Sequence, residues 1–513
     1  MINRLNLTLL LFPALAMSLG WGIRGDYGHE AGAMIAGALV ALAICLQSKR
    51  KDWLDRVVII AMAGAVGWAF GGQMSYGVVI GYTASSSFRD VFYGYACLFA
   101  IGAMWGGIGA GILALALTEK RSFIESLGLP LVLFYAIWLV ISHSGLSGKI
   151  SSRWSFNDTD WVAGSMALII TGSVAIASSR HRAAARFLVI LAAGWLAGLI
   201  VLNGLLRLRM TPPRSDNWAG CAGLTVALIL YLILSKNRAA LMLSLYGLLA
   251  GGIGFAFGDF IQMIGRAQWG PIARFASLQG LDYWKWMEML FGMIMGFGVA
   301  LGIKQLLKLN LKSPLEDVQG GLMRSIGLIV LFVVMPWENI VKNVRAWTQN
   351  QTISDSLLNV SPQKWILIVA ILLTSVFLIA LARHRKQSLP FVPATQFGKT
   401  QLLLLMLVWL FVIADFAQML PVLKARGVLF VQVKFWLLAC VCSMIAILSS
   451  PEMLQTSVPE VDSSDPSDGR WLPGWRFWLI WVMVPFFLFV LAKATLSMHS
   501  EPLPGSQLRF AVY

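Results

Sequence analysis

The sequence predicts an all-α, polytopic membrane protein with about 15 transmembrane helices. Of its 513 residues, 58% are hydrophobic and 12% are charged, whereas a soluble domain is about a quarter charged. Many windows of about 18 or more apolar residues are long enough to cross the ~30 Å hydrocarbon layer as helices. These apolar runs are continuous, while the strands of a membrane barrel would alternate.

The predicted spans follow the apolar runs along the chain. The N-terminal run resembles a signal peptide, because Arg4 precedes it and Ala14–Ala16 could end it. It continues to Leu19, so we expect it to be retained as the first span. The spans cover roughly residues 5–22, 31–47, 57–73, 91–117, 127–142, 161–178, 187–206, 218–234, 241–258, 284–303, 325–341, 364–382, 400–420, 428–448 and 475–494.

The loops between these spans alternate in charge. One set is short and basic, including Lys49–Lys51, Lys120–Arg121, Arg180–Arg182 and Arg383–Lys386, so the positive-inside rule predicts that it is cytoplasmic, together with the N-terminus. The other set is mixed in sign and is expected outside. This pattern suits a bacterial inner membrane. It also explains the net charge of +16, and no nucleic-acid partner is predicted.

An internal duplication is predicted from two glycine-rich segments. Gly64–Gly71 resembles Gly251–Gly258, and each closes a predicted span, six spans apart. The spans that follow them are both Gly-rich and aromatic. We therefore expect two parallel six-helix repeats followed by three additional helices, a plan that some transporters use. The expected segments are residues 1–182, 183–386 and 387–513, the last with a flexible Pro/Ser/Asp-rich loop at 449–474.

The segment Gly20–Glu30 is the most polar stretch between two apolar runs. Its glycines allow close approach and positive φ, and Arg24 offers a planar fork for a carboxylate or a phosphate. Asp26 could orient Arg24, His29 could move protons, and Glu30 could cap the next helix. Ionisable groups in such a segment favour a functional site. The alternative is an interfacial turn in which Arg24 pairs with Asp26.

Other polar residues lie in the outer halves of the predicted spans, whereas the inner halves contain almost none. Asp259 with Gln262 and Asp415 with Gln418 each share one helix face. A polar cavity that opens outward is the simplest interpretation, and Tyr76 and Glu288 are further candidates for it. We expect substrate binding by Arg24, Asp26, His29, Glu30, Gln73, Gln262, Arg266 and Gln418, and ion or proton coupling by Asp259, Glu338 and Asp415. A structural ion pair remains the alternative for each acid.

Two functions fit these features. The first is a secondary transporter, in which the acids bind protons or an ion and Arg24 holds an anionic group. The alternative is an outward-facing membrane-embedded transferase for a glycosyl, acyl or phosphoryl group on a lipid-linked substrate, with Asp26 or His29 as base. A structural or assembly partner is a third possibility. No catalytic residue is assigned.

The sequence lacks a P-loop, a zinc signature and a GxSxG motif. No cofactor and no metal site are therefore predicted. The glycine string 106–111 lies within an apolar span, so close helix packing explains it better than nucleotide binding. The expected partners are membrane lipid and a small-molecule or lipid-linked substrate. The sequence leaves the oligomeric state open.

Overall fold

The computed structural model is helical throughout the part of the chain that it describes. By length and composition, twelve of its helices can cross a membrane, and Val57–Gly71 and Val433–Leu448 are shorter apolar helices. The predicted class, a helical multi-pass membrane protein, is confirmed at this level. The predicted span 364–382 and the loop 449–474 lie almost wholly outside the described residues. Those residues are 2–508 apart from 73, 75, 152–159, 209, 211–216, 310, 312, 315–320, 345–359, 361–363, 365–367, 369–374, 376–397, 427–429 and 450–472.

The helices follow the apolar runs of the sequence. In chain order they are α1 (Ile2–Arg24), α2 (Glu30–Ser48), α3 (Lys51–Asp55), α4 (Val57–Gly71), α5 (Gly77–Thr83), α6 (Phe88–Thr118), α7 (Arg121–Ser126), α8 (Gly128–His143), α9 (Leu146–Ser151), α10 (Asp160–Ala177), α11 (Arg182–Gly198), η1 (Leu199–Leu205), α12 (Asn217–Leu234), α13 (Arg238–Arg266), η2 (Gly270–Arg274), α14 (Ala276–Gln279), α15 (Tyr283–Lys308), α16 (Leu322–Ile329), η3 (Val330–Val334), η4 (Trp337–Val341), α19 (Lys399–Arg426), α20 (Phe430–Leu448), α21 (Trp475–Leu496) and η7 (Ser506–Leu508).

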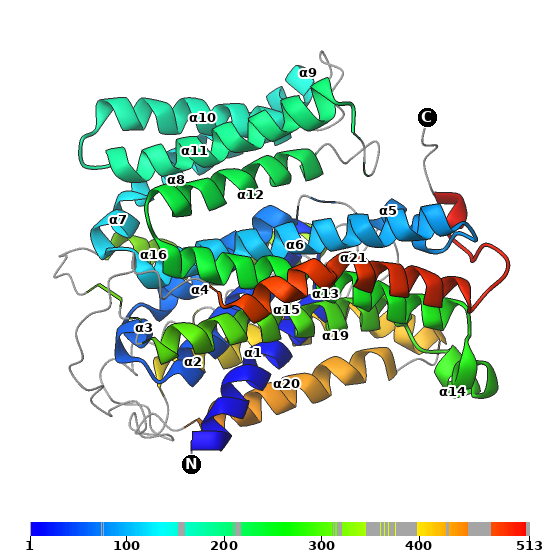
Figure 1. The fold of residues 1–513 in the computed structure, drawn as a ribbon. Helices are drawn as coiled ribbons and strands as arrows, with labels where there is room; N and C mark the ends of the chain where they lie inside the picture. The colour runs from blue at the N-terminus through cyan, green and yellow to red at the C-terminus, as the bar shows by residue number, and fades with distance from the viewer. Residues whose placement is uncertain are drawn as a thin grey trace.

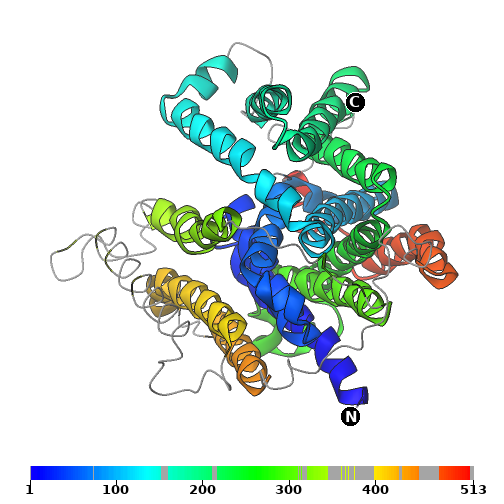
Figure 2. The same cartoon turned by 90° about the vertical axis from the view of Figure 1, so that its left-hand side faces the viewer.

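The long helices run side by side, so the connecting segments gather at two ends of the bundle (Figure 1). We call these the α3 end, which also holds α7, and the α5 end, which also holds α14 and η7 (Figure 1). Helices α1, α2, α4, α6, α13 and α15 pack together in the centre, seen end-on in Figure 2. Helices α8, α10, α11 and α12 form a layer on one side (Figure 1). Helix α21 packs on α6 and α13.

Glycines hold the central helices in backbone contact. A methyl group added at Gly106 would lie 2.1 Å from the carbonyl oxygen of Gly247, and one at Gly102 would lie 2.3 Å from that of Gly251. Both pairs are spaced four residues apart along α6 and α13, the small-residue pattern that brings membrane helices together. The glycine string 106–111 therefore serves helix packing, as the sequence indicated.

The two predicted repeats hold helices in unlike surroundings. Helices α1 and α2 lie in the centre against α15 and α4. Helices α11 and α12, their expected counterparts, pack on each other in the side layer (Figure 1). The internal duplication therefore stays a prediction made from the sequence.

Candidate functional site

The site begins where α1 ends and the chain turns back into α2. The turn is tight, because the amides of Tyr27 and Gly28 both donate to the carbonyl of Arg24, at 3.0 and 3.2 Å. Gly28 has φ +115°, a conformation that glycine tolerates best. Gly32 lets α2 pass directly beside this turn, since a methyl group there would lie 2.5 Å from the Arg24 carbonyl oxygen. The glycine pattern thus positions Arg24 at the start of a hairpin.

The Arg24 side chain is buried, with 2% of its surface exposed. Its Nη1 donates to the Tyr76 hydroxyl at 2.7 Å and to Glu288 Oε1 at 3.3 Å. Its Nη2 lies 2.6 Å from His29 Nδ1. A guanidinium can only donate, so His29 accepts at Nδ1 and carries its proton on Nε2. Arg24 therefore joins an exposed histidine to a buried carboxylate.

Glu288, on α15, is the carboxylate at the centre of the cluster. Its Oε1 also accepts from the Tyr76 hydroxyl at 2.7 Å and from Trp284 Nε1 at 3.2 Å. Its Oε2 lies 3.6 Å from the ammonium of Lys285. The Glu288 carboxylate is thus surrounded by donors and cations, the arrangement that a buried charge requires.

Lys285 extends the cluster to Asp26. Its Nζ donates to Asp26 Oδ2 at 2.8 Å and to the carbonyl of Gly22 at 3.3 Å. Gly25 lies directly over this group, because a methyl group there would lie 2.7 Å from Glu288 Oε2. Two cations and two carboxylates therefore meet in one place, with Arg24, Lys285 and Glu288 buried and Asp26 half-buried at its edge. Such a cluster is expensive to desolvate, and ionisable groups kept inside a membrane protein point to function.

Aromatic rings enclose the Arg24 guanidinium. Its Cζ lies 4.8 Å from the ring centroid of Trp105, 5.2 Å from Trp21 and 5.4 Å from Tyr76. Burial raises the pKa of the Tyr76 phenol above its ordinary value, against the opposing charge of Arg24. Tyr76 therefore remains a neutral donor to Glu288. The rings also exclude water, which strengthens the ionic contacts inside.

The segment 339–343 and helix α19 contact the turn between α1 and α2. Asn339 and Asn343 donate to the carbonyls of Ala31 and Tyr27, each at 2.9 Å. The Tyr27 hydroxyl donates to the carbonyl of Phe411 on α19 at 2.5 Å. Burial raises the pKa of Tyr27, and the nearby charges of Asp415 and Asp26 add to this shift. Asp415 is buried, and its charge acts on Tyr27 in the turn.

Asp259, Gln262 and Arg266 form a second cluster on one face of α13. With its amide nitrogen toward Asp259, Gln262 donates to Asp259 Oδ1 and accepts from Arg266 Nη2, both at 3.1 Å. Arg266 Nη1 also donates to the carbonyl of Pro504 at 3.2 Å. The segment after α21 therefore closes over this cluster. The hydrogen bonds of Gln262 and Arg266 described above do not involve Arg24.

Glu338 and Glu30 are the remaining predicted residues whose side chains the structure describes. Glu338 pairs with Lys342 at 2.9 Å, one helical turn away, and Lys342 is 66% exposed. Glu30 is exposed at the first position of α2. Gln73 and the side chain of Gln418 lie outside the described part of the structure. Among the described side chains, no group of three or more His, Cys, Asp or Glu residues could hold a metal ion.

Lys285 is the member of the cluster that sequence reasoning missed. It stands at the second position of a predicted span, where a lysine is typical of the membrane surface. Lys285 lies three residues before Glu288, so the two side chains share one helix face. This spacing is the feature of the sequence that could have identified Lys285 as part of the site. Its pairing with Asp26 joins residues 259 positions apart, a contact that local spacing does not indicate.

The fold and this cluster define a helical multi-pass membrane protein with a buried ionic site near one end of the bundle. No known protein family matches the chain, and no curated protein or solved structure matches it. The function is therefore argued from its own residues.

Proposed function

We propose that this protein is a secondary transporter that takes up an anionic substrate at Arg24 together with a proton. The observation that carries the proposal is the position of Arg24 between the exposed His29 and the buried Glu288. A guanidinium is a strong ligand for carboxylate and phosphate groups, and histidine changes its charge near neutral pH. The substrate is expected to be small and to carry at least one such group.

Protonation of His29 would change what Arg24 can bind. The neutral ring accepts from Arg24 Nη2 at 2.6 Å, whereas the protonated ring has no acceptor and repels the guanidinium. An anion that bridges the two cations relieves this repulsion, so proton and anion would bind together. Glu288 keeps Arg24 neutralised when the anion leaves. Asp259, Glu338 and Asp415 remain proposed as further coupling groups.

The same proposal puts the α5 end outside and the N-terminus in the cytoplasm of a bacterial cell, with the protein in the inner membrane. Basic residues at the α3–α4 junction, at the start of α7 and at the start of α11 support this orientation, because these helix ends lie at the α3 end (Figure 1). These residues are Arg56, Arg121 and Arg182.

An outward-facing transferase is the second candidate, and the packing of the bundle centre favours it. Close backbone contacts such as Gly37 against Gly64, where an added methyl group would lie 2.2 Å from a carbonyl oxygen, hold the helices together. A site that works from one face needs no separation of these helices, whereas alternating access does. Asp26 or His29 would then be the base, and Arg24 would hold a phosphate of the lipid-linked substrate.

The transport proposal is tested with the full chain in proteoliposomes that contain a pH-sensitive dye. Gradients of acetate, succinate, sulfate and inorganic phosphate are imposed in turn. We expect at least one anion to acidify the interior in a protein-dependent manner, and His29→Gln to abolish this flux. His499→Gln, which changes a half-buried histidine outside the Arg24 cluster, is the control and should retain it.

Two results would overturn the proposal. One is the absence of proton movement with every anion, and the other is an equal flux in His29→Gln and wild type. Envelope glycolipids that change in a deletion strain, as seen by mass spectrometry, would support the transferase instead.

A further inference from the structure

Asp259 lies buried near the end of α13 with one carboxyl oxygen unsatisfied. The residue is 0% exposed. Its Oδ1 accepts from the Gln262 amide at 3.1 Å, whereas no described residue donates to Oδ2 within hydrogen-bond distance. An ionised carboxylate inside a protein needs several donors or a cation in direct contact. The surroundings of Asp259 therefore do not suit a negative charge.

Arg266 reaches Asp259 only through Gln262. Its Nη2 donates to the Gln262 amide oxygen at 3.1 Å, and its Nη1 donates to the carbonyl of Pro504 at 3.2 Å. Both acceptors are uncharged. Arg266 is itself half-buried, so water solvates part of its charge. Its contacts therefore do not require an ionised carboxylate beneath it.

Two hydroxyl groups lie close to Asp259, those of Thr83 at the end of α5 and Tyr95 on α6. Thr83 Oγ1 donates to the carbonyl of Ile80 at 2.9 Å, and the Tyr95 hydroxyl lies 2.6 Å from Thr495 Oγ1. A threonine hydroxyl has one hydrogen and two lone pairs, so Thr83 can still accept. A proton on Asp259 Oδ2 would supply the missing donor, and both groups would then be satisfied.

The segment 503–505 covers this carboxyl at the α5 end. The amide of Leu503 donates to the carbonyl of Ala84 at 2.9 Å, directly after α5. Gly505 fits against Arg266, because a methyl group there would lie 3.0 Å from Nη1, and its φ is +96°. Helix η7 follows and packs on α5 (Figure 1). Arg266 thus connects the cover to the carboxyl beneath it.

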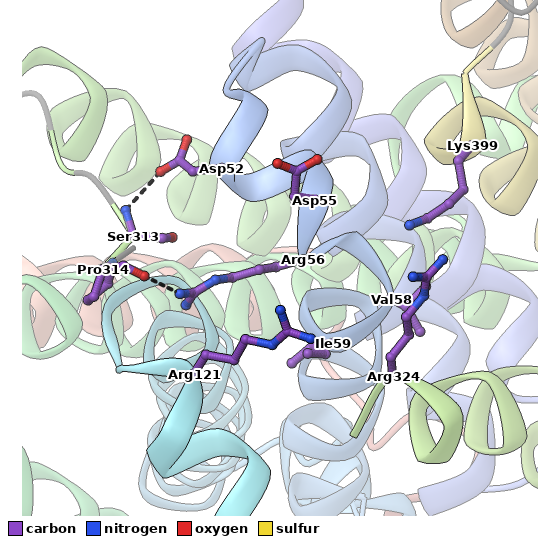
Figure 3. A pocket seen from close by; sticks show the side chains of 10 residues that line it. All are labelled: Asp52, Asp55, Arg56, Val58, Ile59, Arg121, Ser313, Pro314, Arg324 and Lys399. Carbon is purple, nitrogen blue, oxygen red and sulfur yellow. Dashed lines mark hydrogen bonds between the residues drawn. The ribbon is translucent and has the colours of Figure 1, made fainter. Parts of the chain in front are cut away.

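The cavity at the α3 end lies far from this site. It has a volume of about 210 Å³, and residues from the α3–α4 junction, α7, α16 and α19 converge on it (Figure 3). Asp259 stands near the other end of the bundle, where α13 leads into η2 and α14. Water therefore reaches Asp259 from the α5 end, past the segment 503–505.

We propose that Asp259 is a proton-binding site, protonated in the folded protein and donating from Oδ2 to Thr83 Oγ1, with the segment 503–505 as its cover. The neutral carboxyl avoids the cost of a buried charge without a direct partner. Acids kept inside membrane proteins mark proton pathways. The proton site stands without any transport activity, whereas its use as a coupling group rests on the proposed function.

Infrared spectroscopy of the purified full chain in lipid tests the proton site at pH 7, about three pH units above the ordinary pKa of an aspartate. A protonated carboxyl has a carbonyl stretching band that a carboxylate lacks. We expect this band in the spectrum of wild type minus Asp259→Asn. Asparagine reproduces the donor and the acceptor of the neutral acid, so this variant should fold. Wild type minus Glu338→Gln is the control and should show carboxylate bands, because Glu338 pairs with a lysine that is 66% exposed. Carboxylate bands in the first difference would overturn the proposal.

Deuterium exchange of the same band tests the cover, since its rate reports how often Asp259 meets water. We expect Arg266→Gln to speed the exchange by about tenfold, the usual effect of losing a charged hydrogen bond. Gly505→Ala strains the cover and should act in the same direction. Arg238→Gln changes a half-buried arginine at the start of α13 and should exchange as wild type does. A rate that both Arg266→Gln and Gly505→Ala leave unchanged would refute the cover.

Proton flux in proteoliposomes tests the coupling role separately. We expect Asp259→Asn to lose the acidification that an anion gradient drives in wild type. Undiminished flux in Asp259→Asn would overturn the coupling role and leave the proton site standing. Absence of flux in wild type would overturn the proposed function, while the infrared band would still decide whether Asp259 holds a proton.

Discussion

Replacing Glu288 by glutamine should destabilise the protein more than any single change at its surface. The Glu288 side chain is 3% exposed and the Arg24 side chain is 2% exposed, so neither charge can be rehydrated in place. Glutamine keeps the side-chain volume and an acceptor for the Tyr76 hydroxyl. It leaves the two cations Arg24 and Lys285 with Asp26 as the one remaining carboxylate of the cluster. Removing one partner of a buried ion pair costs roughly 3–5 kcal/mol. We therefore expect Glu288→Gln to lower the free energy of unfolding by an amount in that range.

The assay is equilibrium unfolding in mixed micelles, followed by tryptophan fluorescence. Glu338→Gln is the matched control, because it removes a carboxylate from a pair whose lysine is 66% exposed, and such pairs are worth about 0–1 kcal/mol. The loss of unfolding free energy in the double variant Arg24→Gln/Glu288→Gln should be smaller than the summed losses of the two single variants. The difference should be about 0.5–3 kcal/mol, the usual coupling energy between residues in contact. A cost of Glu288→Gln no larger than that of Glu338→Gln would show that water already solvates the cluster, and would refute the reasoning.

Three further outcomes follow from the packing and the turn. Gly106→Val should yield no folded protein on size exclusion, since its β-carbon would lie 2.1 Å from a carbonyl oxygen, whereas Gly172→Val meets nothing within 4 Å and should fold. Burial raises the pKa of Tyr27 and Tyr76 above 10.0. As the pH rises, these phenols therefore lose their protons in the unfolded chain before they do so in the folded protein. Their contribution to the free energy of unfolding is complete below pH 10 and decreases above it. The loss should reach at most about 1.4 kcal/mol per pH unit for each tyrosine, and Tyr76→Phe should flatten an alkaline titration of unfolding by up to that amount; an unchanged slope would contradict the assignment. In a background with Cys440→Ser, a membrane-impermeant maleimide outside the cell should label Gly148→Cys but not Ser179→Cys, and the reverse pattern would invert the proposed orientation.

Part of the candidate site could be predicted because its residues stand together in the chain. Arg24, Asp26 and His29 share one turn, and Tyr76 and Glu288 were recognisable as polar groups in apolar surroundings. Glu338 has the same appearance in the sequence, yet its carboxylate pairs locally with Lys342 near the surface. Hydropathy measures how apolar a stretch is, but it does not state which face of a helix points inward. The distinction between Glu288 and Glu338 therefore required the packed structure.

The sequence by itself determined that this chain forms apolar helices and that its scarce ionisable groups concentrate near helix ends, because the cost of burying charge in hydrocarbon acts on each segment separately. Only the tertiary structure decided which of those groups meet. The contact between α1 and α15 brings Arg24 to a carboxylate 264 positions away, and the convergence of four segments makes the cavity at the α3 end. Both depend on how helices pack through their glycines, a property of pairs of helices rather than of any one stretch.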